Sequence, residues 1–207
     1  MLCLTHATPA PWVKAALADL DAVLVDHAHC EMKAASNALS LAVRAAHVPR
    51  VVGELVALAE EELSHFRRVF AELERRGIPL GPPPPDGYAG ELRKIVRARR
   101  EPSREPDGWQ QTGALVDRLL VAALIEARSC ERFRLLSQAL EEKGFDELSA
   151  FYQELLAAEA RHFRTFVDLA REVGHPHEDR VVARLDEVAR LEGDLSSRLA
   201  GAPAIHG

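Results

Sequence analysis

The stretches Glu62-Leu63-Ser64-His65 and Glu159-Ala160-Arg161-His162 decide the fold of this chain. Each places a carboxylate and an imidazole three residues apart. In a helix, both side chains then lie on one face and can reach the same metal ion. The two stretches are 97 positions apart. Together they predict two long helices that face each other across a metal site.

A third match to the pattern, Glu172 with His175, does not indicate a metal site. Roughly one such match is expected by chance in a chain of this composition, so the spacing alone says little. Gly174 and Pro176 end the helical pattern here, and no other helix supplies a matching Glu. We therefore expect this pair to lie outside any metal site.

Apolar residues recur at intervals of three and four over four long segments, which is typical of helices with one buried face. The segments run from about Trp12 to the break at Pro49, and over about 51–76, 112–143 and 146–173. A last amphipathic segment, about 178–199, carries no comparable polar residue on its apolar stripe, and we interpret it as a packing or capping helix. Hydrophobic residues make up 47% of the chain and aromatic residues only 5%, with Ala and Leu dominant, which also favours an all-α protein.

The order of these segments predicts a single ferritin-like domain over residues 1–207. Two helices joined by a short turn are followed by a long crossover, about 77–111, and then by two more helices joined by a short turn. The run Pro82 to Pro85 makes part of the crossover stiff and non-helical. This connectivity is that of a ferritin-like four-helix bundle, here about 12–173, with an additional C-terminal helix.

Each of the four long helices carries one Glu on its apolar stripe. The four are Glu31, Glu62, Glu126 and Glu159, and corresponding residues of the two halves lie 95 and 97 positions apart. A carboxylate buried without a partner costs several kcal/mol, and the stripes hold no Lys or Arg near these positions. Two divalent cations would balance four carboxylates, and the nitrogens of His65 and His162 favour iron or manganese over calcium.

Two alternatives bear on this ligand set. A single Glu on an apolar stripe is more often an edge residue than a ligand, but four Glu and two His in a matched repeat favour a dinuclear site. Glu131 competes with Glu126 for the third helix. Five residues turn a helix by about 140°, which places Glu131 near Arg128 and Arg134, so we predict Glu126.

His27 shares a helix face with Glu31. It could support a ligand from behind or line a substrate pocket, and an ordinary partly buried histidine is the competing interpretation. Cys30 and Cys130 look like small core residues near the site rather than ligands. The three cysteines are too scattered for a disulfide framework, which fits a reduced compartment.

Charge and hydropathy indicate which compartment and which kinds of partner the protein is suited to. No segment approaches 18 uncharged apolar residues and no basic region precedes an apolar run, so we expect a cytoplasmic protein without a membrane partner. The net charge of −6 argues against a generally nucleic-acid-binding surface. One basic concentration lies in the crossover, and it consists of Arg93, Lys94, Arg97, Arg99, Arg100 and Arg104.

With these motifs in hand, the sequence resembles the MiaE family of tRNA hydroxylases over about residues 12–173. The stretch Ile125-Glu126-Ala127-Arg128-Ser129-Cys130-Glu131-Arg132-Phe133 is the most specific carrier. The others are Asp26-His27-Ala28-His29-Cys30-Glu31-Met32-Lys33-Ala34-Ala35-Ser36, Glu61-Glu62-Leu63-Ser64-His65-Phe66, and Glu159 with His162. The resemblance implies a non-haem di-iron monooxygenase that hydroxylates the isopentenyl group of 2-methylthio-isopentenyl-adenosine in tRNA.

The resemblance also implies the parts of the site. Two iron ions, with manganese as the less favoured metal, would be held by Glu31, Glu62, His65, Glu126, Glu159 and His162. Glu62 and Glu159 would bridge them, O₂ would be the co-substrate, and an outside reductase would supply electrons. The six basic residues of the crossover are candidates for contacts with tRNA phosphates, against the alternative of an ordinary solvated surface.

Two other functions share much of this pattern. A ferroxidase or peroxide-scavenging ferritin relative would use the same six ligands without a tRNA substrate. A noncatalytic helical scaffold would use the polar stripe only as a structural network. The sequence leaves the oligomeric state and the residues of a substrate pocket open.

Overall fold

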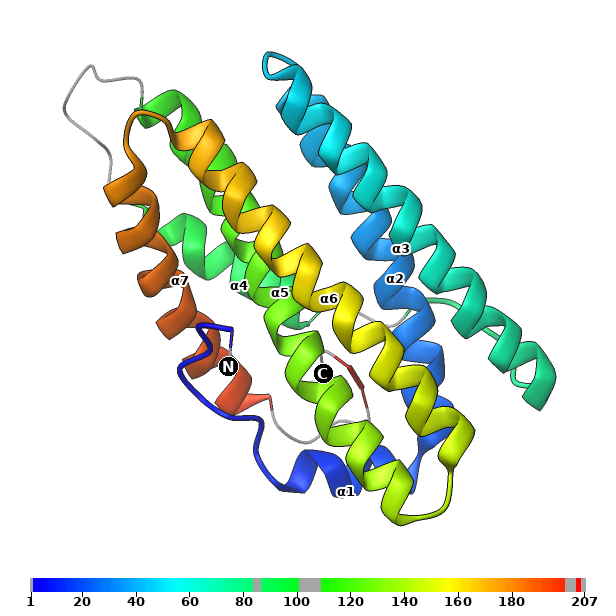
Figure 1. Ribbon diagram of the computed structural model, residues 1–207. Helices are drawn as coiled ribbons and strands as arrows, with labels where there is room; N and C mark the ends of the chain where they lie inside the picture. The colour runs from blue at the N-terminus through cyan, green and yellow to red at the C-terminus, as the bar shows by residue number, and fades with distance from the viewer. Residues whose placement is uncertain (1, 84–86, 101–108, 200–203, 206–207) are drawn as a thin grey trace.

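The computed structural model describes residues 2–83, 87–100, 109–199 and 204–205. These residues form seven helices and no strand (Figure 1). In chain order the helices are α1 (Pro11–Ala18), α2 (Leu20–Arg44), α3 (Pro49–Arg76), α4 (Tyr88–Ala98), α5 (Trp109–Glu142), α6 (Asp146–Gly174) and α7 (Glu178–Arg198). The prediction of an all-α ferritin-like fold is confirmed.

The four long helices pair as two hairpins, α2 with α3 and α5 with α6, and the hairpins meet through α3 with α6 and α2 with α5 (Figure 1). The turns between partners are short. Gly144 supplies a left-handed φ of 76° in the turn between α5 and α6. Gly77, with a φ of 70°, ends α3 where the crossover begins. The long crossover thus returns the chain so that α5 and α6 repeat the arrangement of α2 and α3.

The first long segment is two helices rather than one. Asp19 leaves the helical conformation, with φ −143° and ψ 72°, and its carboxylate accepts a hydrogen bond of 3.0 Å from the Ala22 backbone N–H. An Asp at this position caps the start of a helix by satisfying a free N–H group. The expected continuous helix from about Trp12 is therefore wrong at Asp19, and α1 crosses the end of the bundle instead (Figure 1).

The crossover contains the helix α4, which the sequence analysis did not anticipate as a separate element. Tyr88, Leu92 and Val96 are spaced four apart and are all buried, while the charged residues of α4 other than half-buried Arg93 are exposed. This apolar stripe packs on α5 and α7. Of the six basic residues predicted for the crossover, Arg93, Lys94 and Arg97 lie on α4, Arg99 and Arg100 follow it, and Arg104 lies outside the described residues.

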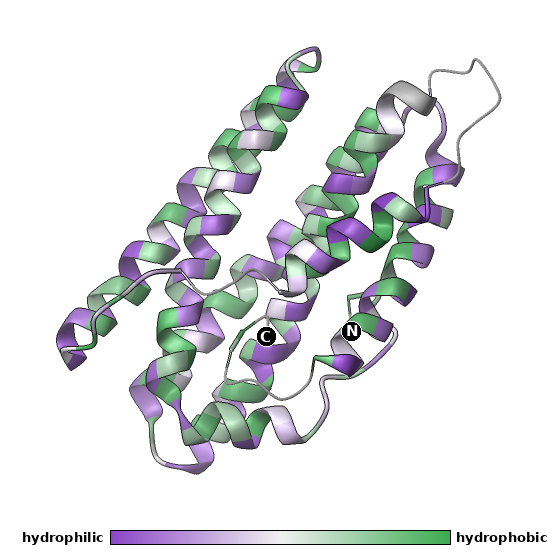
Figure 2. Ribbon diagram, turned by 180° about the vertical axis from the view of Figure 1, so that it is seen from behind, coloured by the Kyte–Doolittle hydropathy of each residue, from purple (hydrophilic) through white to green (hydrophobic). Residues whose placement is uncertain are grey.

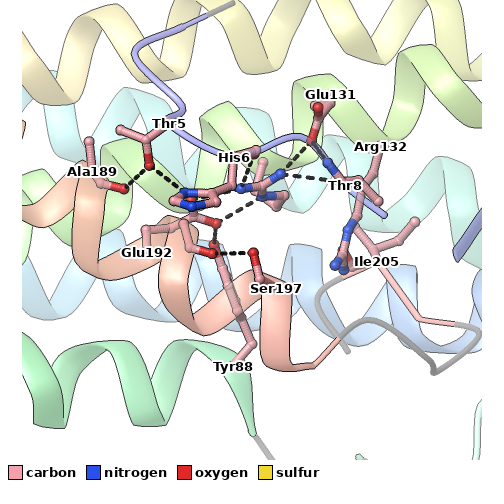
Figure 3. A network of polar contacts seen from close by, with 12 residues as sticks. Thr5, His6, Thr8, Tyr88, Glu131, Arg132, Ala189, Glu192, Ser197 and Ile205 are labelled. Carbon is pink, nitrogen blue, oxygen red and sulfur yellow. Dashed lines mark hydrogen bonds and ion pairs between the residues drawn. The ribbon is translucent and has the colours of Figure 1, made fainter. Parts of the chain in front are cut away.

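The expectation that the last helix has no polar core residue is wrong. Glu192 of α7 is fully buried, and its carboxylate accepts two hydrogen bonds of 2.8 Å from Arg128 of α5. It also accepts one of 2.6 Å from the Tyr88 hydroxyl, within the network drawn in Figure 3. A carboxylate can be buried where a guanidinium and further donors satisfy it, and that partner lies 64 positions away in the chain.

Two apolar clusters fill the bundle, one on each side of a polar layer. On each long helix the inward Glu lies between a residue of one cluster and a residue of the other: Glu62 lies between Leu55 and Val69, and Glu126 between Leu119 and Phe133. Each helix carries both hydrophobic and hydrophilic residues around its circumference (Figure 2). Within the described ranges, no helix has an apolar stretch long enough to cross a membrane.

Candidate metal centre

The polar layer consists of the six residues predicted as ligands. Glu31 comes from α2, Glu62 and His65 from α3, Glu126 from α5, and Glu159 and His162 from α6, and none is more than 6% exposed. Each helix presents its carboxylate inward because the residues one and two turns away on the same stripe are apolar and buried. The structure therefore brings all six side chains to one level of the bundle.

These side chains form two overlapping groups. Ligand atoms of Glu31, Glu62, His65 and Glu159 lie within 4.8 Å of one another, and so do those of Glu62, Glu126, Glu159 and His162. Glu62 and Glu159 belong to both groups. The imidazole rings of His65 and His162 are stacked, with centroids 5.7 Å apart. Two four-ligand groups that share two carboxylates are the arrangement that two adjacent metal ions require.

The hydrogen bonding of the layer is incomplete in a way that fits metal ions. Buried Glu62 Oε1, Glu159 Oε1, His65 Nδ1 and His162 Nδ1 have no hydrogen-bond partner among the described residues. His162 Nδ1 is 2.9 Å from Glu62 Oε1, but the two atoms are close without the alignment of a hydrogen bond. Unsatisfied buried polar atoms are costly, and divalent cations would use these lone pairs. The donor set of carboxylate oxygens and imidazole nitrogens suits iron or manganese.

Without a cation, the layer retains protons. Burial, and then the charges of neighbouring carboxylates, raises the pKa of Glu126 well above its usual range. Burial also raises the pKa of Glu31 and of Glu62. Burial alone would lower the pKa of the histidines, but the surrounding carboxylates raise it to about 10 for His65 and about 11 for His162. Because metal ligands must lose their protons, metal uptake at this centre would release protons.

His162 is oriented by Glu61, a residue that the sequence analysis did not select. The His162 Nε2–H donates to Glu61 Oε2 at 2.6 Å, and Arg161 donates to Glu61 Oε1 at 2.8 Å. Because Glu61 holds the Nε2 proton, Nδ1 faces the carboxylates, and its lone pair would become available to a metal ion once the Nδ1 proton has left. Glu61 precedes Glu62 in the sequence, but only the packing of α3 on α6 shows which histidine it contacts.

His27 orients the carboxylate of Glu31 as Glu61 orients the ring of His162. The ring is fully buried between Phe133 and Tyr152, and its Nε2 lies 2.7 Å from Glu31 Oε1. Burial lowers the pKa of His27 to about 4, so the ring is neutral and its Nε2–H donates to the carboxylate. Of the interpretations weighed from the sequence, support of a ligand is the one that this contact favours.

The residues rejected as ligands lie elsewhere. Glu131 pairs with Arg128, Glu172 with Arg50, and His175 with Glu178. Cys30 and Cys130 belong to neither group of ligand atoms found among the described residues. The Cys130 side chain is buried and its thiol points to the Leu156 carbonyl, as expected of a small core residue.

A hollow of about 250 Å³ opens onto the layer from the side of α2, α4 and α5. All four carboxylates of the layer border it, whereas His65 and His162 do not. Its other walls are largely apolar and include Ala34, Ala89, Ala122, Ile125, Phe133 and Phe166. An apolar hollow with carboxylates at its base can admit a small hydrocarbon group to a bound metal.

A second hollow, of about 420 Å³, lies beside the first and is basic. Arg93, Lys94, Arg97 and Arg100 border it together with Arg118 of α5, and Arg93 also borders the hollow above the carboxylates. Burial and then the charges of Arg44, Arg93, Arg97 and Arg100 lower the pKa of Arg118. Arg99 does not border this hollow, and its carbonyl accepts from Arg184 at 3.5 Å. Arg44 and Arg118 lie on other helices, α2 and α5, so their place beside the arginines of α4 was not predictable from the crossover sequence.

Comparison with known proteins bears on what this centre does. The family model described as tRNA-(MS[2]IO[6]A)-hydroxylase (MiaE) matches residues 1–207. The chain belongs to the MiaE family. The expectation from the sequence is thereby confirmed, and members of this family are tRNA hydroxylases.

Individual relatives agree with this assignment. The MiaE-family chain is 43% identical, over 183 residues, to the tRNA 2-(methylsulfanyl)-N(6)-isopentenyladenosine(37) hydroxylase of Pseudomonas putida; the match covers 88% of this chain and 80% of that protein. It is 34% identical over 146 residues to the Salmonella typhimurium protein of the same name, covering 70% of this chain and 47% of that one.

Two further relatives place the fold. A rubrerythrin of Porphyromonas gingivalis is 23% identical over 140 residues, covering 68% of this chain and 58% of that protein. Among solved structures, a Synechococcus protein described as having aldehyde deformylating oxygenase activity superimposes with a TM-score of 0.79 at 36% identity. That match covers 99% of this chain and 95% of the other.

Replacing Glu126 by Gln should affect the metal-free and metal-loaded proteins in opposite directions. Folding raises the pKa of Glu126 above 4.5, so as pH rises the unfolded chain loses the Glu126 proton at a lower pH than the folded chain does. The free energy of unfolding of the metal-free protein therefore falls as pH rises. We expect metal-free Glu126→Gln to melt above the metal-free wild type at pH 7, with the difference shrinking toward pH 4.5. The variant should also bind less iron.

Thermal melting as a function of pH and iron analysis after loading would check this expectation. The matched control on the same helix is Glu131→Gln, which removes a partner of buried Arg128 and should lower the melting temperature with or without metal. A lower melting temperature for metal-free Glu126→Gln, together with a full iron content, would contradict the assignment.

Replacing Glu61 by Ala should weaken metal binding although Glu61 lies outside the ligand set. Loss of the carboxylate that orients a metal-bound histidine typically costs about 10–100-fold in affinity. Competition with a chelator of known affinity would measure the loss. The neighbouring exposed residue gives the control Glu60→Ala, and an equal effect in both variants would show that Glu61 has no specific role.

Proposed function

We propose that this chain hydroxylates the isopentenyl group of 2-methylthio-isopentenyl-adenosine in tRNA, using O₂ and two iron ions. The observation that carries the proposal is the pair of overlapping ligand groups at the base of an apolar hollow, in a chain of the MiaE family. The relatives from Pseudomonas putida and Salmonella typhimurium carry the name of this reaction's substrate.

In this proposal Glu31, His65, Glu126 and His162 would hold the two ions together with Glu62 and Glu159, the residues that belong to both ligand groups. Iron would supply the redox chemistry by which O₂ is reduced and an allylic C–H bond is oxidised, with electrons from an external reductase. Manganese fits the same donor atoms and is the less favoured metal. A tRNA substrate would place the enzyme in the cytoplasm.

The protein's own residues bind and orient the reacting groups. The apolar walls of the hollow accept the isopentenyl group and exclude water from the carboxylates. Glu61 holds the His162 ring with its Nδ1 toward the centre, and neutral His27 donates to Glu31 and fixes that carboxylate. These contacts keep the ligands in place before metal or substrate arrives.

The basic hollow is our candidate for contacts with the tRNA backbone. Arg93 borders both hollows, so a phosphate held by the arginines of α4 would lie next to the opening through which a modified base enters. Lys94 pairs with Glu91 at 2.6 Å, and Arg100 lies 3.8 Å from Asp117. We assign the main contacts by position, to Arg93, which borders both hollows, and to Arg97 and Arg118, which border the basic hollow.

A ferroxidase or peroxide-scavenging function is the alternative, and the similarity to a rubrerythrin favours it. Both functions would use the same ligands. They differ in whether tRNA is needed: a scavenger would oxidise its ferrous centre with O₂ or peroxide equally well without tRNA.

The deciding experiment supplies reconstituted iron-loaded protein with O₂, a reductant and hypomodified tRNA. We expect mass spectrometry of the digested tRNA to show a nucleoside heavier by one oxygen atom. The matched control is the Glu62→Ala, Glu159→Ala variant, which should lose both iron and activity. Rapid oxidation of the wild-type centre by peroxide, with no hydroxylated nucleoside, would favour the alternative.

Replacing Arg93, Arg97 and Arg118 together by Ala should weaken tRNA binding and flatten its salt dependence. Each lost phosphate contact lowers the slope of log K against log salt by about 0.7–0.9. Binding titrations over a range of salt concentrations would measure the slope. The control replaces Arg67, Arg75 and Arg164, three exposed arginines of α3 and α6, with Ala. An equal effect in the two triple variants would remove the basic hollow from the interface.

A further inference from the structure

The hollow above the carboxylates has one wall that does not belong to the bundle. Ala204 and Ile205 border it together with Tyr88 and Ala89 of α4. Ile205 is fully buried and packs in the apolar cluster that contains Trp12, Phe133 and Tyr152. Two residues from far along the sequence are thus built into the site.

Three side chains hold this segment by its backbone. The Ile205 N–H donates to Asp26 Oδ2 at 2.7 Å, and the Trp12 indole N–H donates to the Ala204 carbonyl at 2.8 Å. Arg132 donates to the Ile205 carbonyl and, at 3.4 Å, to the Ala204 carbonyl. Figure 3 shows Arg132 reaching the segment at Ile205. A segment fixed at both N–H and C=O cannot shift without breaking several buried hydrogen bonds.

The anchors are themselves fixed to the metal-bearing helices. Asp26 lies on α2 five residues before Glu31, and Arg132 lies on α5 six residues after Glu126. Arg132 is fully buried, and its guanidinium lies over the Trp12 ring at 5.1 Å. Burying a guanidinium is costly, and here its described hydrogen bonds go to backbone carbonyls of this segment. The position of Ile205 is therefore set by the helices that carry the ligands.

We propose that Ile205 is a specificity-determining residue that limits the size of the group entering the hollow, and that Asp26 and Arg132 are positioning residues that hold it there. The identity of that group as an isopentenyl chain rests on the proposed function. A hydrocarbon wall discriminates by volume: a larger side chain excludes the substrate, and a smaller one admits bulkier analogues.

Nucleoside binding to zinc-loaded protein, which cannot turn over, tests this role. The probes are N6-isopentenyl-adenosine and the bulkier N6-benzyl-adenosine, titrated by calorimetry. We expect Ile205→Phe to weaken binding of the isopentenyl nucleoside by about tenfold or more, and Ile205→Ala to shift the affinity ratio toward the benzyl nucleoside by about tenfold. Val182→Phe and Val182→Ala, at an exposed position of α7, are the size-matched controls.

The positioning residue Asp26 gives a rescue test. Asp26→Ala removes the acceptor for the Ile205 N–H and should shift the affinity ratio in the same direction as Ile205→Ala. Asp26→Asn keeps a side-chain oxygen that can accept this bond, so its ratio should stay near that of the wild type. Equal shifts for Asp26→Asn and Asp26→Ala would remove Asp26 from this role.

A second measurement separates this inference from the substrate assignment. In ferrous-loaded protein, the rate at which a chelator removes iron reports access through the hollow without any nucleoside. We expect faster removal from Ile205→Ala and slower removal from Ile205→Phe than from the wild type. If the wild type bound neither nucleoside but these rates changed as expected, the role of Ile205 in limiting access would be supported and the assignment of the substrate would be wrong. Unchanged rates and unchanged affinity ratios would overturn the inference.

Discussion

The structure depends on one electrostatic constraint: four carboxylates lie at one level of an apolar bundle. Glu31, Glu62, Glu126 and Glu159 come from four different helices, and apolar clusters lie above and below them. Such a layer is unfavourable unless protons or cations neutralise it. A proton-loaded layer and a metal-loaded layer are two ways to meet this constraint, and the buried carboxylate and imidazole atoms that have no hydrogen-bond partner among the described residues favour the second.

A second pair of buried carboxylates in the same chain is neutralised by a different kind of partner. Glu131 and Glu192 are also buried, but Arg128 lies between them and donates to both, with Tyr88 and Thr8 completing the network. Both arrangements use residues of α5, because Arg128 follows Glu126 of the carboxylate layer by two residues. A buried guanidinium neutralises Glu131 and Glu192 permanently, whereas protons on the four-carboxylate layer could be exchanged for cations.

Much of the bundle was predictable because its signals are local. The spacing of apolar residues marked the long helices, and the single Glu on each stripe marked the polar layer. Other features depend on which helices meet. Glu61 contacts His162 across 101 positions, Glu192 meets Arg128 across 64, and Arg118 joins the arginines of α4 only in the folded chain. The break at Asp19 was missed because the apolar pattern continues through it, although a capping Asp is a visible local signal.

The two sides of the polar layer differ in what can reach them. The hollow lies on the side of α2, α4 and α5, whereas His162 and its partner Glu61 lie between α3 and α6, where the Glu61 side chain is 47% exposed. An electron donor that used the α3 and α6 face would leave the α4 side open. A protein of this small size could then hold a nucleic acid and a redox partner at the same time, so that reduction would not have to wait for the tRNA to leave.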